Sequence, residues 1–280
     1  MRTVLNSVAR WLGFSATLTR TSRYPTLHRV VRIEPLEGRS LLSASPISGD
    51  VAASSPAAEV APLIASVVPA AAPGEGFVIA LYRDVLDRAP DTNGLNFFTN
   101  MLTNGATPSD IVSLIWESAE HRGIQIDSYY TTFLERPADS FGRQTWIKRM
   151  LDGMTEETVI GSFLTSPEYQ ILNPLNAPFV TALYNEVLDR APDTPGLTTF
   201  VTVLGNGTAT PTGVVQSFLG SREYHLLVVN SFYTDFLQRA PDTAGQAYWV
   251  QKLDQNLLDA QFIAETFLSS QEYINLHPLF

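Results

Sequence analysis

The apolar positions in the C-terminal part of the chain recur with a spacing that predicts amphipathic helices. Before each of four arginines, apolar side chains lie seven, six, three and two positions upstream. In the first copy they are Leu81, Tyr82, Val85 and Leu86, before Arg88. This spacing places them on one face of a helix. The helix is predicted to end at the arginine, because a proline close behind it disfavours helical backbone.

A structural repeat signature surrounds these arginines. In each copy a Tyr lies six residues before the Arg, and an Asp and a Gly follow the Arg by three and six residues. The copies are Tyr82-Arg88-Asp91-Gly94, Tyr130-Arg136-Asp139-Gly142, Tyr184-Arg190-Asp193-Gly196 and Tyr233-Arg239-Asp242-Gly245. We interpret Tyr as a core residue and Asp as the N-cap of a second helix. Arg is expected to cap the carbonyls of the first helix and pair with the Asp, and Gly to adapt the turn.

Each copy is predicted to contain a third helix and a short closing helix. The third helix is expected to begin at residues that favour N-cap positions: Thr107, Thr155, Thr210 and Asp259. A Ser-x-Glu sequence then ends every copy, followed by Tyr in three copies and by His121 in the first. Its Ser suits an N-cap, and its Glu suits the positive end of a helix. The predicted fold class is all-α.

The spacing between copies groups them into two pairs. The Arg and the closing Ser are 30, 30, 31 and 31 residues apart, whereas the Ser is 18, 24 and 18 residues from the next Arg. Residues 77–95 and 179–197 differ at only 4 of 19 positions, which indicates duplication of a pair. We predict two tandem helical modules, 77–175 and 176–280, each built from two copies of a roughly 50-residue repeat.

The N-terminal region has a different composition. Residues 1–44 form an Arg-rich, sorting-like segment, whose first 43 residues carry seven Arg and two acids and no apolar run long enough to span a bilayer. Residues 45–76 are rich in Ala, Ser, Pro and Val, which predicts a flexible linker. Both are expected to be disordered.

A short sequence in the first segment resembles a sorting motif. Leu36, Glu37, Arg39, Leu41 and Leu42 fit the LEPR-XLL motif that heads many large planctomycete surface and secreted proteins, with a Gly in place of its Pro. The resemblance implies export to the cell surface or beyond. The alternative is a disordered basic tail in which the Leu-Leu pair arose by chance.

The repeats resemble a bacterial family known as domain of unknown function 4214. The resemblance covers residues 77–280, through strings such as LYRDVLDRAPDTNGLNFF and endings such as SPEY, SREY and SQEY. That family is similar to phycobilisome linker domains, which are helical, non-catalytic organisers of assemblies. Its members often accompany surface-layer, adhesin-like and calcium-binding repeat proteins. Copy two inverts the Ala-Pro order at Pro137-Ala138, which leaves the conformation of its loop open.

Charge and composition limit the chemistry. The net charge is −10, and residues outside the Arg-rich segment carry no clustered Lys and Arg, which argues against nucleic-acid binding. The chain has no Cys, which excludes disulfides, thiolate ligands and Cys nucleophiles. Calcium binding by the four signature Asp residues is opposed by the Arg three positions away. An enzyme would need residues such as His121, Glu156 and Glu157 to converge in a cleft, so no catalytic, cofactor or metal residue is predicted.

These observations favour a non-catalytic structural or protein-interaction module that is exported or displayed on the cell surface. Its expected partner is a protein or a component of the cell envelope, with no transmembrane helix in the chain itself. The alternatives are an intracellular assembly scaffold resembling phycobilisome linkers, a calcium-binding surface module and an enzyme.

Overall fold

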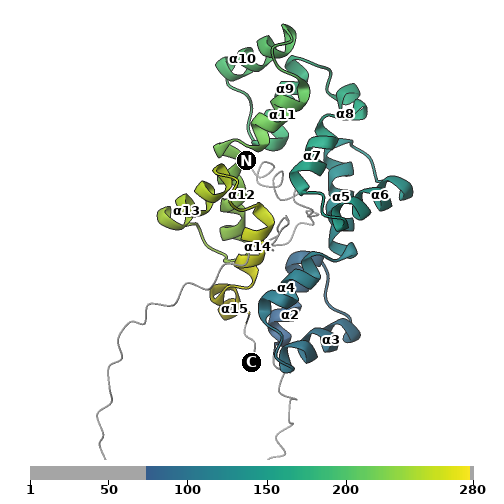
Figure 1. Ribbon diagram of the computed structural model, residues 1–280, viewed down its shortest axis with the longest axis vertical. Helices are drawn as coiled ribbons and strands as arrows, with labels where there is room; N and C mark the ends of the chain where they lie inside the picture. Colours follow the sequence, from purple (N-terminus) through teal and green to yellow (C-terminus); the bar gives the residue numbers. More distant parts are fainter. Residues whose placement is uncertain (1–73, 278–280) are drawn as a thin grey trace, which may run out of the picture. The chain divides into compact units, whose positions relative to one another are not determined.

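The computed structural model describes residues 74–277, and this part of the chain is entirely helical, with no strand (Figure 1). The all-α prediction is confirmed. The predicted sorting-like segment, and the predicted linker up to residue 73, lie outside the described residues. The helices are α2 (Glu75–Leu86), α3 (Thr92–Thr103), α4 (Pro108–Trp116), α5 (Ala119–Phe133), α6 (Ser140–Leu151), α7 (Glu156–Leu164), α8 (Pro167–Leu172), α9 (Ala177–Val187), α10 (Thr194–Gly205), α11 (Pro211–Leu219), α12 (Arg222–Asp235), α13 (Thr243–Asp254), α14 (Ala260–Leu268) and α15 (Gln271–Leu276).

The closing helix takes two forms, which follow the spacing between copies. Where 18 residues separate the closing Ser from the next Arg, the closing helix continues into the first helix of the next copy, as in α5 and α12. Where 24 residues separate them, Asn173, Pro174 and Asn176 interrupt the helix and leave the short α8 before α9. Asn176 has a φ of 82°, in the left-handed region. The last copy ends in the short α15.

The predicted helix starts are confirmed. Each signature Asp adopts extended backbone, and its carboxylate accepts a hydrogen bond from the backbone N–H of the signature Gly. Thr107, Thr155, Thr210 and Asp259 cap the third helices in the same way, and the closing Ser residues cap the helices that follow them. Each cap satisfies a backbone donor that would otherwise have no partner in the helix.

The prediction that the first helix ends at the Arg is wrong by two to four residues. The four helices end at Leu86, Phe133, Val187 and Asp235. The residue directly before each Arg then adopts left-handed backbone, with φ between 51° and 53°: Asp87, Glu135, Asp189 and Gln238. Each Arg N–H donates to the carbonyl of the signature Tyr six residues earlier, at 3.2–3.3 Å. A left-handed residue at this place ends a helix, and that residue is usually Gly.

The core lies between the first, third and closing helices, while the second helices are peripheral. The largest fully buried side chains include Phe77, Trp116, Phe179 and Phe232, all outside the second helices. Helix α10 has no buried residue, and α3 buries only Thr99. The second helix of each copy (α3, α6, α10 and α13) therefore contacts the core through one face only. We call these four helices the arms.

Contacts between copies form a closed circuit. Copies 1 and 2 share α5, and copies 3 and 4 share α12. Helix α7 of copy 2 packs on α11 of copy 3, and α14 of copy 4 packs on α4 of copy 1. All described residues belong to one compact unit, in which the two predicted modules meet at two junctions. The division at residue 175 stays a prediction.

The left-handed turn before Arg239 predicts a stabilising substitution. Gln238 is exposed and has a φ of 52°, a conformation that costs an L-residue about 1–2 kcal/mol. We expect Gln238→Gly to raise the free energy of unfolding by about 0.5–1 kcal/mol, because Gly adopts this backbone without steric cost but loses more chain entropy on folding. Urea denaturation measures the change. Gln238→Ala is the control and should give no gain; a gain from Ala as large as that from Gly would contradict the conformational explanation.

Candidate functional site

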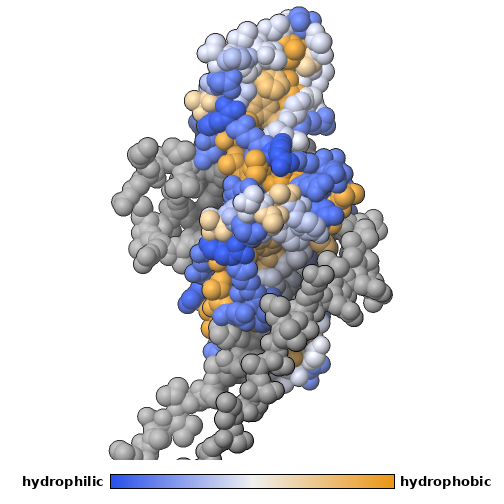
Figure 2. All heavy atoms as spheres, turned by 90° about the vertical axis from the view of Figure 1, so that its left-hand side faces the viewer, coloured by the Kyte–Doolittle hydropathy of each residue, from blue (hydrophilic) through white to orange (hydrophobic). Residues whose placement is uncertain are grey.

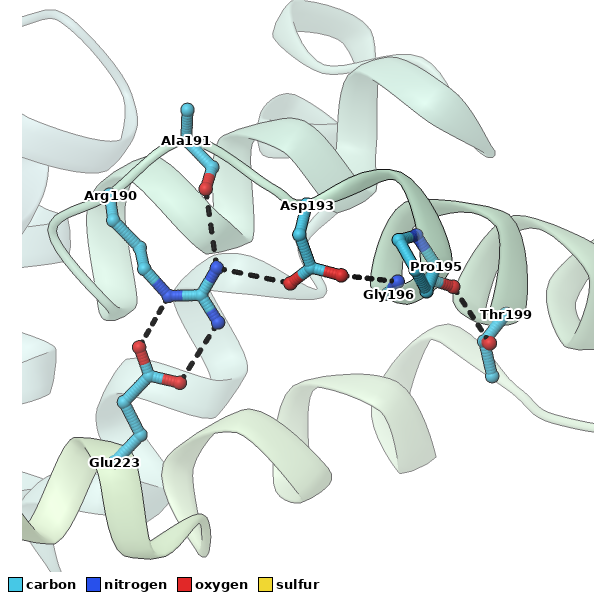
Figure 3. Close-up of polar contacts among 7 residues, drawn as sticks. All are labelled: Arg190, Ala191, Asp193, Pro195, Gly196, Thr199 and Glu223. Carbon is cyan, nitrogen blue, oxygen red and sulfur yellow. Dashed lines mark hydrogen bonds and ion pairs between the residues drawn. The ribbon is translucent and has the colours of Figure 1, made fainter.

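The repeated arginines are held by the glutamates of the closing Ser-x-Glu sequences. In every copy Nε and Nη2 of the Arg donate to the two carboxylate oxygens of one Glu, and the Nη2–Oε2 distance is 2.9–3.0 Å. The pairs are Arg88–Glu120, Arg136–Glu168, Arg190–Glu223 and Arg239–Glu272. Figure 3 shows the third of these pairs. Bidentate pairing of this kind fixes the orientation of the guanidinium as well as its position.

The remaining nitrogen of each guanidinium faces the loop. In copy three, Nη1 of Arg190 donates to the carbonyl oxygen of Ala191 at 3.3 Å and to Oδ2 of Asp193 at 3.3 Å (Figure 3). The other copies have the same carbonyl contact, at 3.1–3.2 Å, and an Arg–Asp distance of 3.6–3.7 Å. The predicted Arg–Asp pairing is confirmed. The predicted capping is wrong, because the carbonyl that accepts belongs to the loop residue after the Arg.

Copy two has the same loop contacts as the others despite its inverted Ala-Pro order. Nη1 of Arg136 donates to the carbonyl oxygen of Pro137 at 3.2 Å, and Asp139 caps α6 through the N–H of Gly142 at 2.8 Å. The sequence left open whether the inverted order changes the loop of copy two. These contacts are unchanged. A backbone carbonyl accepts the bond in every copy, so the identity of the residue that carries it does not matter.

The guanidinium of each signature Arg lies over the ring of the signature Tyr. The guanidinium carbon of each Arg lies 4.7–4.9 Å from the ring centroid of the Tyr in its own copy. The four Tyr residues are 4–5% exposed, so the prediction of a core position is confirmed. A cation at this distance from an aromatic face is attracted by the ring electrons.

The signature Gly is required by the Tyr hydroxyl, not by the turn. None of the four glycines has a positive φ; each lies in the first turn of the second helix. A Cβ atom added at Gly94, Gly142, Gly196 or Gly245 would lie only 2.1–2.3 Å from the hydroxyl oxygen of the Tyr in its copy. The prediction that Gly adapts the turn is therefore wrong. Its missing side chain lets the second helix approach the core.

The signature Arg and Asp side chains are ionised at neutral pH. The hydrogen bond from the Gly N–H is the main cause that holds the pKa of each signature Asp below its usual value. The bond to Glu raises the pKa of each signature Arg, and the same bond lowers the pKa of Glu168 and Glu272. Groups shifted away from neutrality do not suit proton transfer at physiological pH.

A buried polar network, which the sequence analysis missed, links α5 with copy 4. Arg122 is 2% exposed, and its Nη1 and Nη2 donate to Gln125 and Gln261 at 3.1 Å each. Gln261 donates to Glu265 at 2.6 Å, and Glu265 accepts from Ser113 of α4 at 2.7 Å. None of these residues recurs at the same position of the other copies, so the repeat pattern did not indicate this network. Arg122 falls in the predicted closing helix, whose sequence did not indicate that it is buried.

Of the residues considered for an enzyme, His121 and Glu156 bond to different partners. His121 lies against the Trp116 ring, with centroids 4.7 Å apart, and its Nδ1 donates to the Trp116 carbonyl at 2.8 Å. Burial and the neighbouring Arg122 lower the pKa of His121 to about 3. Glu156 accepts a hydrogen bond from Tyr129. Burial and Asp259 raise the pKa of Glu157 to about 7.

The part of the chain that the structure describes contains no group of three or more His, Asp or Glu side chains placed to hold a metal ion. Within residues 74–277, no helix combines the length and the apolar character that crossing a bilayer requires.

The comparisons with known proteins agree with the repeat architecture. Residues 71–124, 162–228 and 228–277 match the family described as Domain of unknown function (DUF4214). The chain belongs to this family. No curated protein and no solved structure matches it. The matched segments of this DUF4214 protein leave out residues 125–161, which contain the copy-two signature, although that copy has the same bridge, cap and Gly–Tyr contact as the other three.

The Gly–Tyr contact predicts a destabilising substitution with a specific rescue. Gly196→Ala should lower the free energy of unfolding by about 1–3 kcal/mol, because the new Cβ would overlap the hydroxyl of Tyr184. In a Tyr184→Phe background the contact with the hydroxyl is removed, and only contacts of 3.2 Å with Cζ of residue 184 and Oδ1 of Asp193 remain, so the cost should be clearly smaller. Thermal and urea denaturation of the two single variants and the double variant measure this coupling.

A second glycine in the same helix supplies the control. Nothing lies within 4 Å of a Cβ added at Gly205, so Gly205→Ala should stabilise the protein by about 0.5–1 kcal/mol through helix propensity alone. If Gly196→Ala were tolerated as well as Gly205→Ala, the close-approach explanation would be wrong.

The raised pKa of Glu157 predicts that stability falls with rising pH. Between the unfolded value of 4.5 and about 7, the folded state holds the proton more tightly than the unfolded chain does. Stability should therefore decrease as pH rises through this window, by an amount on the order of 2–3 kcal/mol from this group. Glu186 and Asp235, each with a pKa raised to about 7 by burial, act in the same direction.

Glu157→Gln tests this group separately, since Gln occupies the matching position of copy 4 as Gln261. Urea denaturation at pH 5.5 and pH 8 should show a smaller pH dependence in the variant than in the unsubstituted protein. Asp152→Asn removes an exposed carboxylate of the same copy and is the control. An unchanged pH dependence in Glu157→Gln would contradict the assignment.

Proposed function

We propose that the protein is a non-catalytic module that binds other proteins. The proposal rests on one observation: the repeated polar groups bond to one another and to the backbone within each copy. Each signature Arg is bonded to a Glu, a loop carbonyl and the signature Asp, and each Asp also caps a helix. The constellation that recurs four times therefore serves the construction of each copy. Within this constellation, the ionised Arg and Asp side chains include no acid or base with a pKa near neutrality.

The peripheral second helices offer surfaces for a partner. Phe97 on α3 is 58% exposed, Phe141 on α6 is 82% exposed and Tyr248 on α13 is 47% exposed. Helices α3 and α10 contain no charged residue. Figure 2 shows apolar side chains among weakly polar ones at the top of the molecule, where α10 lies. Large aromatic side chains are enriched in the energetically important parts of protein interfaces.

The proposed location is the cell surface or the extracellular space. Its support is the LEPR-XLL-like sequence at Leu36, Glu37, Arg39, Leu41 and Leu42. The second candidate is an intracellular assembly scaffold, which the resemblance of this family to phycobilisome linkers supports. Mass spectrometry of fractionated cells distinguishes them, because the full chain would be found in the cytoplasm only if it were a scaffold.

Capture of partners tests the binding function. Full-length protein and the variants Phe97→Asp and Phe141→Asp would be used as bait on cell fractions and on purified envelope. We expect both variants to lose at least tenfold of a partner that the unsubstituted protein retains, since a charge disrupts an apolar contact. Phe141 lies in the first turn of α6, where Asp suits the helix, so the fold should tolerate this change.

Asn185→Asp is the matched control, because it adds the same charge to an exposed position on α9, which is a first helix. Retention of every partner by both Phe variants would rule out the aromatic positions of these helices as the binding surface.

A further inference from the structure

The last copy packs on the first copy with the same geometry as copy two packs on copy three. The ring centroids of Tyr273 in α15 and Phe77 in α2 are 6.1 Å apart, with the rings at 76°. The corresponding rings of Tyr169 in α8 and Phe179 in α9 are also 6.1 Å apart and at 76°. Edge-to-face packing of this kind is specific in orientation. The two junctions thus place equivalent side chains in equivalent positions.

A hydrogen bond and a helix pair repeat with these rings. The hydroxyl of Tyr273 donates to Asp84 at 2.7 Å, and the hydroxyl of Tyr169 donates to Glu186 at 2.8 Å. Both acceptors lie four residues before a signature Arg. The third helices pair at both junctions as well, α14 with α4 and α11 with α7. The terminal copies are therefore complementary in the way that copies two and three are.

The two junctions differ in how the chain connects them. Asn173–Asn176 connect copy two to copy three through the chain, whereas no peptide connects copy four to copy one. The copy four–copy one junction joins two different surfaces, one from each end of the described region. A contact between unlike surfaces can close on itself or continue from one molecule to the next.

The polar groups at the copy four–copy one junction make it easier for the two copies to separate there. Besides the Tyr273 contact, it includes the hydrogen bonds of Ser113 to Glu265 and of Arg122 to Gln261. Arg122 is buried there, and burial lowers its pKa. Water would solvate these groups if the junction opened, so part of the lost bonding would be replaced. An interface built only from apolar side chains has no such compensation.

We propose that the copy four–copy one junction is an exchangeable interface whose other occupant is a second copy of this chain. Helices α14 and α15 of one molecule then pack on α4 and α2 of the next, with the contacts that they make within one chain. This deepens the proposed binding function by naming a partner, and it rests on that function. Within one chain the ends are held at a high effective concentration, so the closed form prevails in dilute solution.

Exchange can be detected by cross-linking between chains that carry single cysteines. The natural sequence has no Cys, so each introduced thiol is unique. Ser113→Cys and Glu265→Cys lie on opposite sides of the junction, where the native side chains are hydrogen-bonded at 2.7 Å. The two full-length variants would be mixed and treated with a short bis-maleimide. A product between these chains forms efficiently only if α14 of one lies on α4 of the other.

Three measurements make the outcome decisive. The double variant Ser113→Cys/Glu265→Cys should cross-link within one chain at low concentration, which shows that the reagent spans the junction. For the mixed single variants, a hundredfold rise in concentration should raise the ratio of interchain product to uncross-linked protein by about a hundredfold until exchange saturates. The matching pair at the connected junction, Gly161→Cys and Gln216→Cys, should give no such product.

The proposal is overturned if the double variant cross-links while the mixed single variants give no interchain product up to millimolar concentration. Equal interchain product at both junctions would also overturn it, because whole halves would then be exchanging. Light scattering of the unsubstituted chain over the same range gives a readout that needs no variant, and a constant monomer mass would count against exchange. Partner capture through Phe97 and Phe141 is measured separately, so the binding function can survive this failure.

Discussion

The bidentate bridge between the signature Arg and the closing Glu is the constraint on which each copy depends. It joins residues 32 or 33 positions apart and fixes the guanidinium over the Tyr ring. The Tyr hydroxyl then contacts the Gly of the second helix, so one set of contacts positions three helices. The bridges are more than one-third exposed, and exposed ion pairs contribute little energy. Their main effect is to select one geometry, because bidentate pairing tolerates few others.

The closed circuit of copies solves a problem that linear repeats face at their ends. In a linear array each terminal repeat exposes a face that a neighbour would cover, and such faces need polar caps. Here α14 covers α4, and the ring of Tyr273 covers Phe77. The junction is completed by Arg122, Gln261 and Glu265, which are not repeated in the other copies. Repetition therefore builds the copies, while unique polar residues specify which ends meet.

The helices and their caps could be predicted from the sequence because both depend on neighbouring residues. Asp193 and its bond to Gly196 lie within one turn. The errors concern contacts between distant residues or unusual backbone. Glu223 was recognised as a helix-start residue, but its bond to Arg190 spans 33 positions. The sequence did not indicate the left-handed backbone at Gln238, because the residue there is not Gly. The sorting-like segment lies outside the described residues, so its role stays a prediction.

The copies differ at an outer position of the second helix, and this difference bears on recognition. Ten residues after each Arg stands an aromatic residue that packs against the core. One position earlier the copies carry Phe97, Thr145, Thr199 and Tyr248, side chains of different size and polarity. The aromatic residue keeps the packing of the second helix on the core the same in every copy. The residue before it differs between copies and changes the surface that the helix exposes. The four arms therefore do not repeat one surface, which suits a module that contacts unlike sites on its partners better than one that repeats a single chemical step.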